Sequence, residues 1–145
     1  MYIFLDIDGV LNKKDDWKKM YSINRECILS FAKLIKKVKN PKIVLTSSWR
    51  DGWDEDTSQN TPQIKSLSTI FANMGTSIIG KTKHSPDKDR SKEINNYIKW
   101  HDKDDYIIID DDTDEFKSPI QHLYIVNSVN GITDNDVKLI CKKYI

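Results

Sequence analysis

A pair of acids follows the first apolar segment of the chain. Asp6 and Asp8 come directly after the apolar residues 2–5, and Gly9 follows them. Two carboxylates this close repel each other unless a cation lies between them or one of them holds a proton. A glycine at this point lets the backbone turn sharply or approach a ligand closely. Because aspartates also cap helices and form turns, the meaning of the pair depends on the residues that lie beside it.

Other polar residues end apolar segments in the same way: Thr46 and Ser47 after residues 43–45, and Asp110 and Asp111 after residues 106–109. The second acid pair, by itself, is also typical of a solvated acidic turn that continues through Glu115. In a parallel sheet, however, ligands bind beyond the carboxyl ends of the strands, where the strand order reverses. Two acid pairs at one such edge would form an oxygen-rich site of the kind that suits Mg²⁺.

The elements that must position these residues alternate between short apolar strands and amphipathic helices. The strands are expected at residues 2–5, 43–45, 77–79, 106–109 and 123–126. The helices are expected around residues 28–38, 63–73, 94–98 and 133–144. This alternation predicts an α/β, three-layer Rossmann-like fold with a mostly parallel central sheet. No repeat or linker divides the sequence, so we expect residues 1–145 to form one domain.

The overall charge of the chain does not by itself select a class of partner. Lys and Arg total 23 and Asp and Glu total 22, so no global field selects nucleic acid, a membrane or an acidic partner. Cys27 and Cys141 form no CxxC pattern and are expected to be the reduced thiols of a cytoplasmic protein. With no secretory leader and no apolar run of about 18 residues, we expect a soluble, unexported chain. The three histidines are scattered and match no metal-ligand spacing.

The motifs, in this order, resemble those of the haloacid dehalogenase (HAD) superfamily of phosphohydrolases and phosphotransferases. The first motif is matched by residues 6–9, the second by residues 45–47 and the fourth by residues 107–111. The third, a lone Lys or Arg near a helix start, is matched best by Arg90, with Lys92 and Lys81 as alternatives. More narrowly, LDIDGVLN, LTSSWR, R-x-x-E-I, IIIDDD and GIT-x-x-D look like the small HAD-type domains associated with RNA-repair proteins. The resemblance covers nearly the whole chain.

The resemblance implies a phosphoric monoester hydrolase that forms an aspartyl-phosphate. Asp6 would be the nucleophile, and Asp8 would protonate the leaving oxygen and then take a proton from water. A Mg²⁺ ion would be held by Asp6, the Asp8 backbone carbonyl, and Asp110 or Asp111. The residues that would hold the phosphoryl oxygens are Thr46 and Arg90.

Three more residues are expected to contact the substrate: Ser47, Arg50 and Lys92. Trp49 and Arg50 have an equally ordinary structural interpretation, as a Trp packed on the sheet edge and an Arg paired with a carboxylate. The segment 13–19, KKDDWKK, is either a solvated turn or the flap that this superfamily has over its active site. Its four lysines and Trp17 would suit phosphate contact and base stacking.

The spacing of the motifs leaves no room for a sizeable cap domain, so the site should be open. We therefore expect a Mg²⁺-dependent phosphatase of phosphate monoesters, acting at RNA or DNA ends. The alternative is a phosphatase of free nucleotides or small metabolites. A phosphoacceptor signalling domain is disfavoured because the strand 43–45 ends in Thr46 rather than in an aspartate. A non-catalytic binding module is disfavoured because every required group is present, and the oligomeric state is left open.

Overall fold

A five-stranded parallel sheet forms the centre of the computed structural model, which describes residues 1–145. Its strands lie in the order β3-β2-β1-β4-β5, and every pairing between neighbours is parallel. The strands are β1 (Tyr2–Leu5), β2 (Lys42–Leu45), β3 (Ile78–Lys81), β4 (Tyr106–Asp110) and β5 (Leu123–Ile125). The helices are α1 (Arg25–Lys37), α2 (Pro62–Asn73), α3 (Arg90–Trp100) and α4 (Asp134–Tyr144). The predicted α/β class is confirmed.

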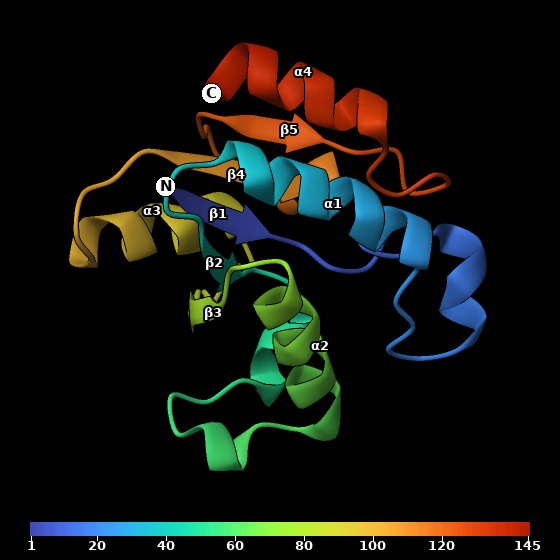
Figure 1. The fold of residues 1–145 in the computed structure, drawn as a ribbon. Helices are drawn as coiled ribbons and strands as arrows, with labels where there is room; N and C mark the ends of the chain where they lie inside the picture. The colour runs from blue at the N-terminus through green and yellow to red at the C-terminus, as the bar shows by residue number, and fades with distance from the viewer.

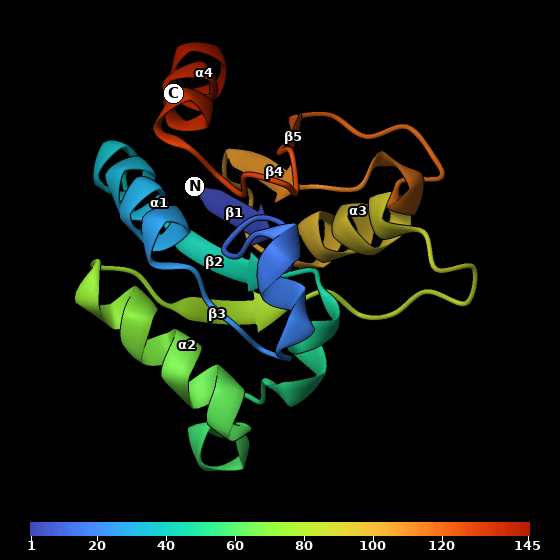
Figure 2. The same ribbon diagram turned by 90° about the vertical axis from the view of Figure 1, so that its right-hand side faces the viewer.

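Helices cover both faces of the sheet and give the three layers that the sequence predicts. Side chains alternate between faces along each strand, so Ile3 and Leu5 of β1 pack in the larger apolar cluster with α1, α2 and α4. Tyr2 and Phe4 point the other way and pack against α3. Figure 2 shows α1, α2 and α4 on one side of the sheet and α3 on the other.

The order of the strands reverses beside the central strand. From β1 the chain builds β2 and β3 on one side, and then β4 and β5 on the other. In open α/β sheets, ligands bind outside the carboxyl ends of the strands at such a point of reversal. Asp6 follows β1 and Asp110 ends β4, so both acids lie at this point. The β1 and β5 arrows in Figure 1 point toward this side of the molecule.

No cap domain interrupts the fold, as predicted. The flap (residues 13–19) holds one 3-10 turn (Lys14–Lys18) and lies with α1 between β1 and β2. Two more 3-10 turns (Ser48–Gly52 and Thr57–Gln59) and α2 are the only elements between β2 and β3. The flap, in a brighter blue than β1, lies beyond the tip of the β1 arrow in Figure 1. No helix is long and apolar enough to cross a membrane.

The start of α3 is fixed by one buried acid. Asp89 caps the helix by accepting a hydrogen bond from the Ser91 backbone N–H at 3.0 Å. The same carboxylate accepts from the Lys117 backbone N–H at 3.0 Å and from the Ser118 hydroxyl at 2.6 Å. The first residue of α3, Arg90, is therefore tied to the segment that follows β4.

The third strand differs from its prediction. We expected a strand at residues 77–79, but β3 begins at Ile78 and runs through Gly80 to Lys81. Gly80 pairs with Val44 of β2, and a Cβ on it would meet the Tyr97 hydroxyl of α3. The glycine thus permits close packing against a helix within the strand, and it does not end the strand.

Candidate active site

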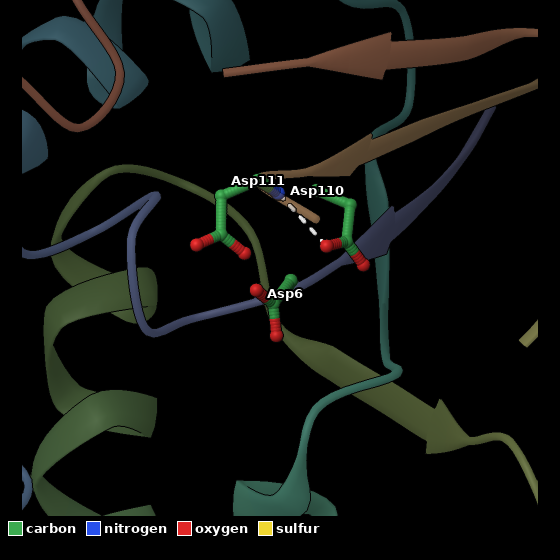
Figure 3. A group of neighbouring side chains, drawn as sticks. All are labelled: Asp6, Asp110 and Asp111. Carbon is green, nitrogen blue, oxygen red and sulfur yellow. Dashed lines mark hydrogen bonds between the residues drawn. The ribbon is translucent and has the colours of Figure 1, made fainter. Parts of the chain in front are cut away.

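Three carboxylates meet at the carboxyl ends of β1 and β4. Asp6, Asp110 and Asp111 each offer an oxygen that lies within 4.8 Å of the others, and Figure 3 shows them grouped beyond the two strands. Asp6 and Asp110 are buried, and Asp111 is half-buried. Close carboxylates on rigid strand ends are the ligands that a hard divalent cation takes in proteins.

The burial of these acids makes their negative charges costly. Burial and the charge of Asp110 raise the pKa of Asp6 well above its usual range. Burial also raises the pKa of Asp110 to about 6, although the nearby Arg90 opposes the shift. Arg90 Nη1 lies 2.6 Å from Asp110 Oδ2 and 3.6 Å from Asp6 Oδ1. The positive charge of Arg90 therefore offsets only part of the negative charge of the three carboxylates, and a bound metal ion would offset the rest.

The turn after β4 and the glycine of the first motif hold Asp111 in place. Asp110 Oδ1 accepts hydrogen bonds from the backbone N–H groups of Asp111 and Asp112, at 2.8 and 3.0 Å. Gly9 has a φ of +85°, and a Cβ on it would overlap the Asp111 carboxylate. This position requires glycine for its backbone conformation and for the close approach of Asp111.

The second acid of the first motif is held by neutral donors. Asp8 Oδ1 accepts hydrogen bonds from Asn12 Nδ2 at 2.9 Å and Trp49 Nε1 at 3.2 Å. Its other oxygen, Oδ2, has no hydrogen-bond partner in the protein. Asn12 Oδ1 in turn accepts from the Gly9 backbone N–H and from Trp17 Nε1, both at 2.8 Å. Asn12 therefore connects Asp8 to the flap.

Thr46 and Ser47 follow β2 at the same edge of the sheet. Thr46 is buried, and its hydroxyl is the single buried side-chain polar atom of the protein without a hydrogen-bond partner. A buried hydroxyl in this state costs free energy that a ligand oxygen would recover. Ser47 Oγ accepts a hydrogen bond from the Trp49 backbone N–H at 3.2 Å and caps the turn at Ser48–Gly52.

A polar cleft opens above these residues and is called here the reactive cleft. It is lined by Asp6, Asp8, Trp17, Ser47, Ser48, Arg90, Asp111, Asp112 and Glu115. Ser48, Asp112 and Glu115 were not among the site residues expected from the sequence. Arg90 is the only basic residue in the lining.

The chain matches one known protein family over nearly its whole length. A family model described as the HAD domain in Swiss Army Knife RNA repair proteins matches residues 2–137. The chain belongs to this family. No curated protein and no solved structure matches it. Membership, together with the aspartate cluster, suggests that this HAD domain is a phosphohydrolase.

The structure does not bring two of the expected substrate contacts to the reactive cleft of the HAD domain. Arg50 is buried, and its Nη1 lies 2.8 Å from Glu93 Oε1 and 3.1 Å from the Thr46 carbonyl oxygen. Lys92 is exposed and pairs with Asp87. These positions favour the structural interpretation of Arg50.

Lys81, an alternative to Arg90, also lies outside the lining. Its Nζ donates to the Trp53 carbonyl oxygen at 2.8 Å. Arg90 is therefore the basic residue beside the carboxylates.

The sequence allowed two interpretations of Trp49, as a packed side chain or as a residue of the site, and the structure shows features of both. Trp49 is only 4% exposed, and it also donates to Asp8. Arg50 lies in the turn after β2, and Glu93 lies in α3, one helical turn beyond Arg90, so their ion pair joins the turn to the helix. The SSWR and R-x-x-E-I motifs are thus two halves of one contact.

Substitution of Gly9 should disable the carboxylate cluster. Gly9→Ala would force a positive φ on alanine and displace Asp111, whereas Gly75→Ala imposes a similar φ of +90° where no atom lies within 4 Å. Both variants should lose about 1–2 kcal/mol of unfolding free energy from backbone strain. Only Gly9→Ala should also lose stabilisation by Mg²⁺, measured by thermal unfolding. Equal stabilisation of the two variants would refute the role of this close approach.

Stabilisation by a divalent metal should grow with pH. Because the pKa of Asp110 is raised to about 6 and that of Asp6 is also raised, the metal-free folded state binds protons that the unfolded state releases. These two acids should therefore stabilise the metal-free protein at low pH and lose that contribution as the pH rises from about 4 through about 6. A metal ion binds the deprotonated acids, so Mg²⁺ should raise the melting temperature much more at pH 8 than at pH 5. An equal rise at both pH values would contradict this linkage.

Loss of either member of the buried ion pair should destabilise the fold. Arg50→Ala or Glu93→Ala leaves an uncompensated buried charge and should cost about 3–5 kcal/mol of unfolding free energy. The double variant should cost less than the sum of the two. Lys92→Ala, which breaks an exposed pair, is the control and should change stability far less. Denaturant unfolding measures all four, and additive losses would show that the two groups do not interact.

Proposed function

We propose that this HAD domain is a Mg²⁺-dependent phosphatase that hydrolyses phosphate monoesters at nucleic-acid ends through an aspartyl-phosphate. The observation that carries the proposal is the meeting of Asp6, Asp110 and Asp111 beside Arg90 at the point where the strand order reverses. The second candidate is a phosphatase of free nucleotides or small metabolites, which the same reactive groups would serve.

Two acids divide the chemistry between them. Asp6 would attack phosphorus with a carboxylate oxygen, and the bond from phosphorus to the leaving oxygen would break. Asp8 Oδ2, which has no protein partner, would donate a proton to that oxygen as it leaves. Asp8 would then take a proton from the water that hydrolyses the aspartyl-phosphate. Each acid thereby returns to its starting form.

The charges of the reactive cleft support a metal requirement. Five acids line the cleft and Arg90 is its only basic residue, so a phosphate dianion would be repelled by the protein alone. Asp6, the Asp8 backbone carbonyl, and Asp110 or Asp111 would hold Mg²⁺. When bound, the ion would neutralise charge between the nucleophile and the phosphate.

Two other groups are suited to hold the phosphoryl oxygens. The buried Thr46 hydroxyl lacks a partner and could donate to an oxygen of the substrate. The Arg90 guanidinium is fixed at the start of α3 and carries further N–H groups beyond the one that bonds Asp110. Donors fixed in this way stabilise the charge that develops on the transferring group.

The open cleft and the flap favour a polymer end. Without a cap domain, the chain beyond the reacting phosphate has room to leave the site. Lys14, Lys18 and Lys19 of the flap are exposed and form no ion pair, whereas Lys13 lies 3.2 Å from Glu26 Oε2. The three exposed lysines could contact the phosphates next to the reacting one.

Removal of the nucleophile tests the reaction. Asp6→Asn keeps the size of the side chain and removes the attacking anion, so kcat should fall by about a thousandfold or more. Phosphate release from end-phosphorylated oligonucleotides, with and without Mg²⁺, measures the loss. Asp114→Asn, an exposed position outside the cleft, is the matched control and should keep its activity. Substantial turnover by folded Asp6→Asn would rule out the covalent role.

Removal of the flap lysines tests the substrate. The triple variant Lys14→Ser, Lys18→Ser, Lys19→Ser should weaken use of an end-phosphorylated oligonucleotide and flatten its dependence on salt, by about 0.7 in log–log slope for each phosphate that is no longer neutralised. The control with the same change in charge places Ser at Lys36 and Lys37, in the last turn of α1, and at Lys39, just beyond that helix. If the wild type prefers free mononucleotides at every salt concentration, the metabolite alternative is correct.

A further inference from the structure

An aromatic hollow lies directly beside the reactive cleft. It is lined by Asp8, Trp17, Lys19, Met20, Tyr21, Ser48 and Trp49. Asp8, Trp17 and Ser48 line both the hollow and the cleft, so the two spaces are continuous. We propose that the aromatic hollow binds the base of the terminal nucleotide while its phosphate lies in the reactive cleft. This inference rests on the proposed function.

Large apolar side chains are exposed in one short segment next to the site. Trp17 is 42%, Met20 78% and Tyr21 47% exposed, and none of them belongs to either apolar cluster of the core. Residues of this size are usually buried, so their gathering around one hollow needs a reason other than core packing. A ligand with a flat ring would bury them.

The rings are held in place before any ligand binds. The indole N–H of Trp17 donates to Asn12, and that of Trp49 donates to Asp8. Tyr21 packs edge-on against Trp49, with ring centroids 5.1 Å apart and planes at 81°. Because the indole N–H of Trp17 is already bonded and the side chain is 42% exposed, Trp17 has a ring face left for a base, while the buried Trp49 supports the Tyr21 ring. Stacking on ring faces accepts every base.

The backbone of Tyr21 is unusual in a way that core packing does not explain. Its φ of +58° lies in the left-handed region, which costs a residue with a side chain about 1–2 kcal/mol. The Ser22 carbonyl next to it accepts a hydrogen bond from Asn12 Nδ2 at 2.8 Å, so the turn is held by the residue that also bonds Asp8. The strained turn places an exposed aromatic ring at the site, as strain at a binding position does.

The charges around the hollow favour a nucleotide over a neutral aromatic ligand. Lys19 is exposed and unpaired and lines the hollow, where Asp8 is the only acid. An anionic phosphodiester next to a stacked base would meet Lys19, and the terminal phosphate would meet Arg90 in the cleft. A base held against Trp17 would also be fixed relative to Asp8, through Asn12, and would help to align the leaving oxygen.

The test compares two oligoribonucleotides, each prepared with a 5′ phosphate and, separately, with a 3′ phosphate. They are identical except that one carries a base on the terminal nucleotide and the other has an abasic sugar there. The wild type should prefer the base-bearing substrate by about tenfold or more in kcat/KM. Equal use of the two substrates would overturn the inference alone, whereas hydrolysis of neither would overturn the proposed function itself.

Substitutions in the aromatic hollow test whether its rings cause the preference for the base-bearing substrate. Trp17→Ala and Tyr21→Ala should bring the ratio of the two kcat/KM values close to one. Trp17→Phe keeps a ring but loses the bond to Asn12, so it should retain most of the preference. Trp100→Ala, 76% exposed at the far end of α3, is the control and should keep the wild-type ratio. A preference that survives both alanine variants, or that Trp17→Phe loses as fully as Trp17→Ala, would show that the rings do not bind the base.

Discussion

Repulsion among buried carboxylates is the constraint on which the rest of the site depends. Asp6 and Asp110 are carried into the interior by two central strands, where water cannot screen their charges. Arg90 offsets part of this cost from the start of α3, and its position is fixed by the Asp89 cap. The rigid sheet prevents the acids from moving apart. The fold therefore holds a site whose excess negative charge a bound cation would neutralise.

The acid proposed to move protons is held in a different way. No charged side chain pairs with Asp8, and one of its oxygens accepts from the neutral Asn12 and Trp49. Neutral donors fix the orientation of a carboxyl group and leave its second oxygen for the substrate. The first motif thus places two acids two residues apart in different surroundings, which suits two different roles.

Hydrogen bonds that radiate from Asn12 join the chemistry to the surface that would meet a substrate. Asn12 bonds to Asp8 on one side and to Trp17 and the Ser22 carbonyl on the other. A ligand that rests on the flap would therefore lie on the same framework that orients Asp8. In a domain without a cap, this short segment is the surface that we propose defines the substrate.

The sequence by itself determined the elements and the family motifs, because strands, helices and caps depend on local periodicity and on residue type. It identified the acids that follow β1 and end β4, and parallel strands place both pairs at one edge of the sheet; that β1 and β4 are neighbours was decided by the tertiary structure. Contacts between distant segments were decided only by the tertiary structure: Arg50 turned to Glu93, and Gly80 continued a strand to make room for a helix. These outcomes depend on which side chains meet in three dimensions, and no local pattern carries that information.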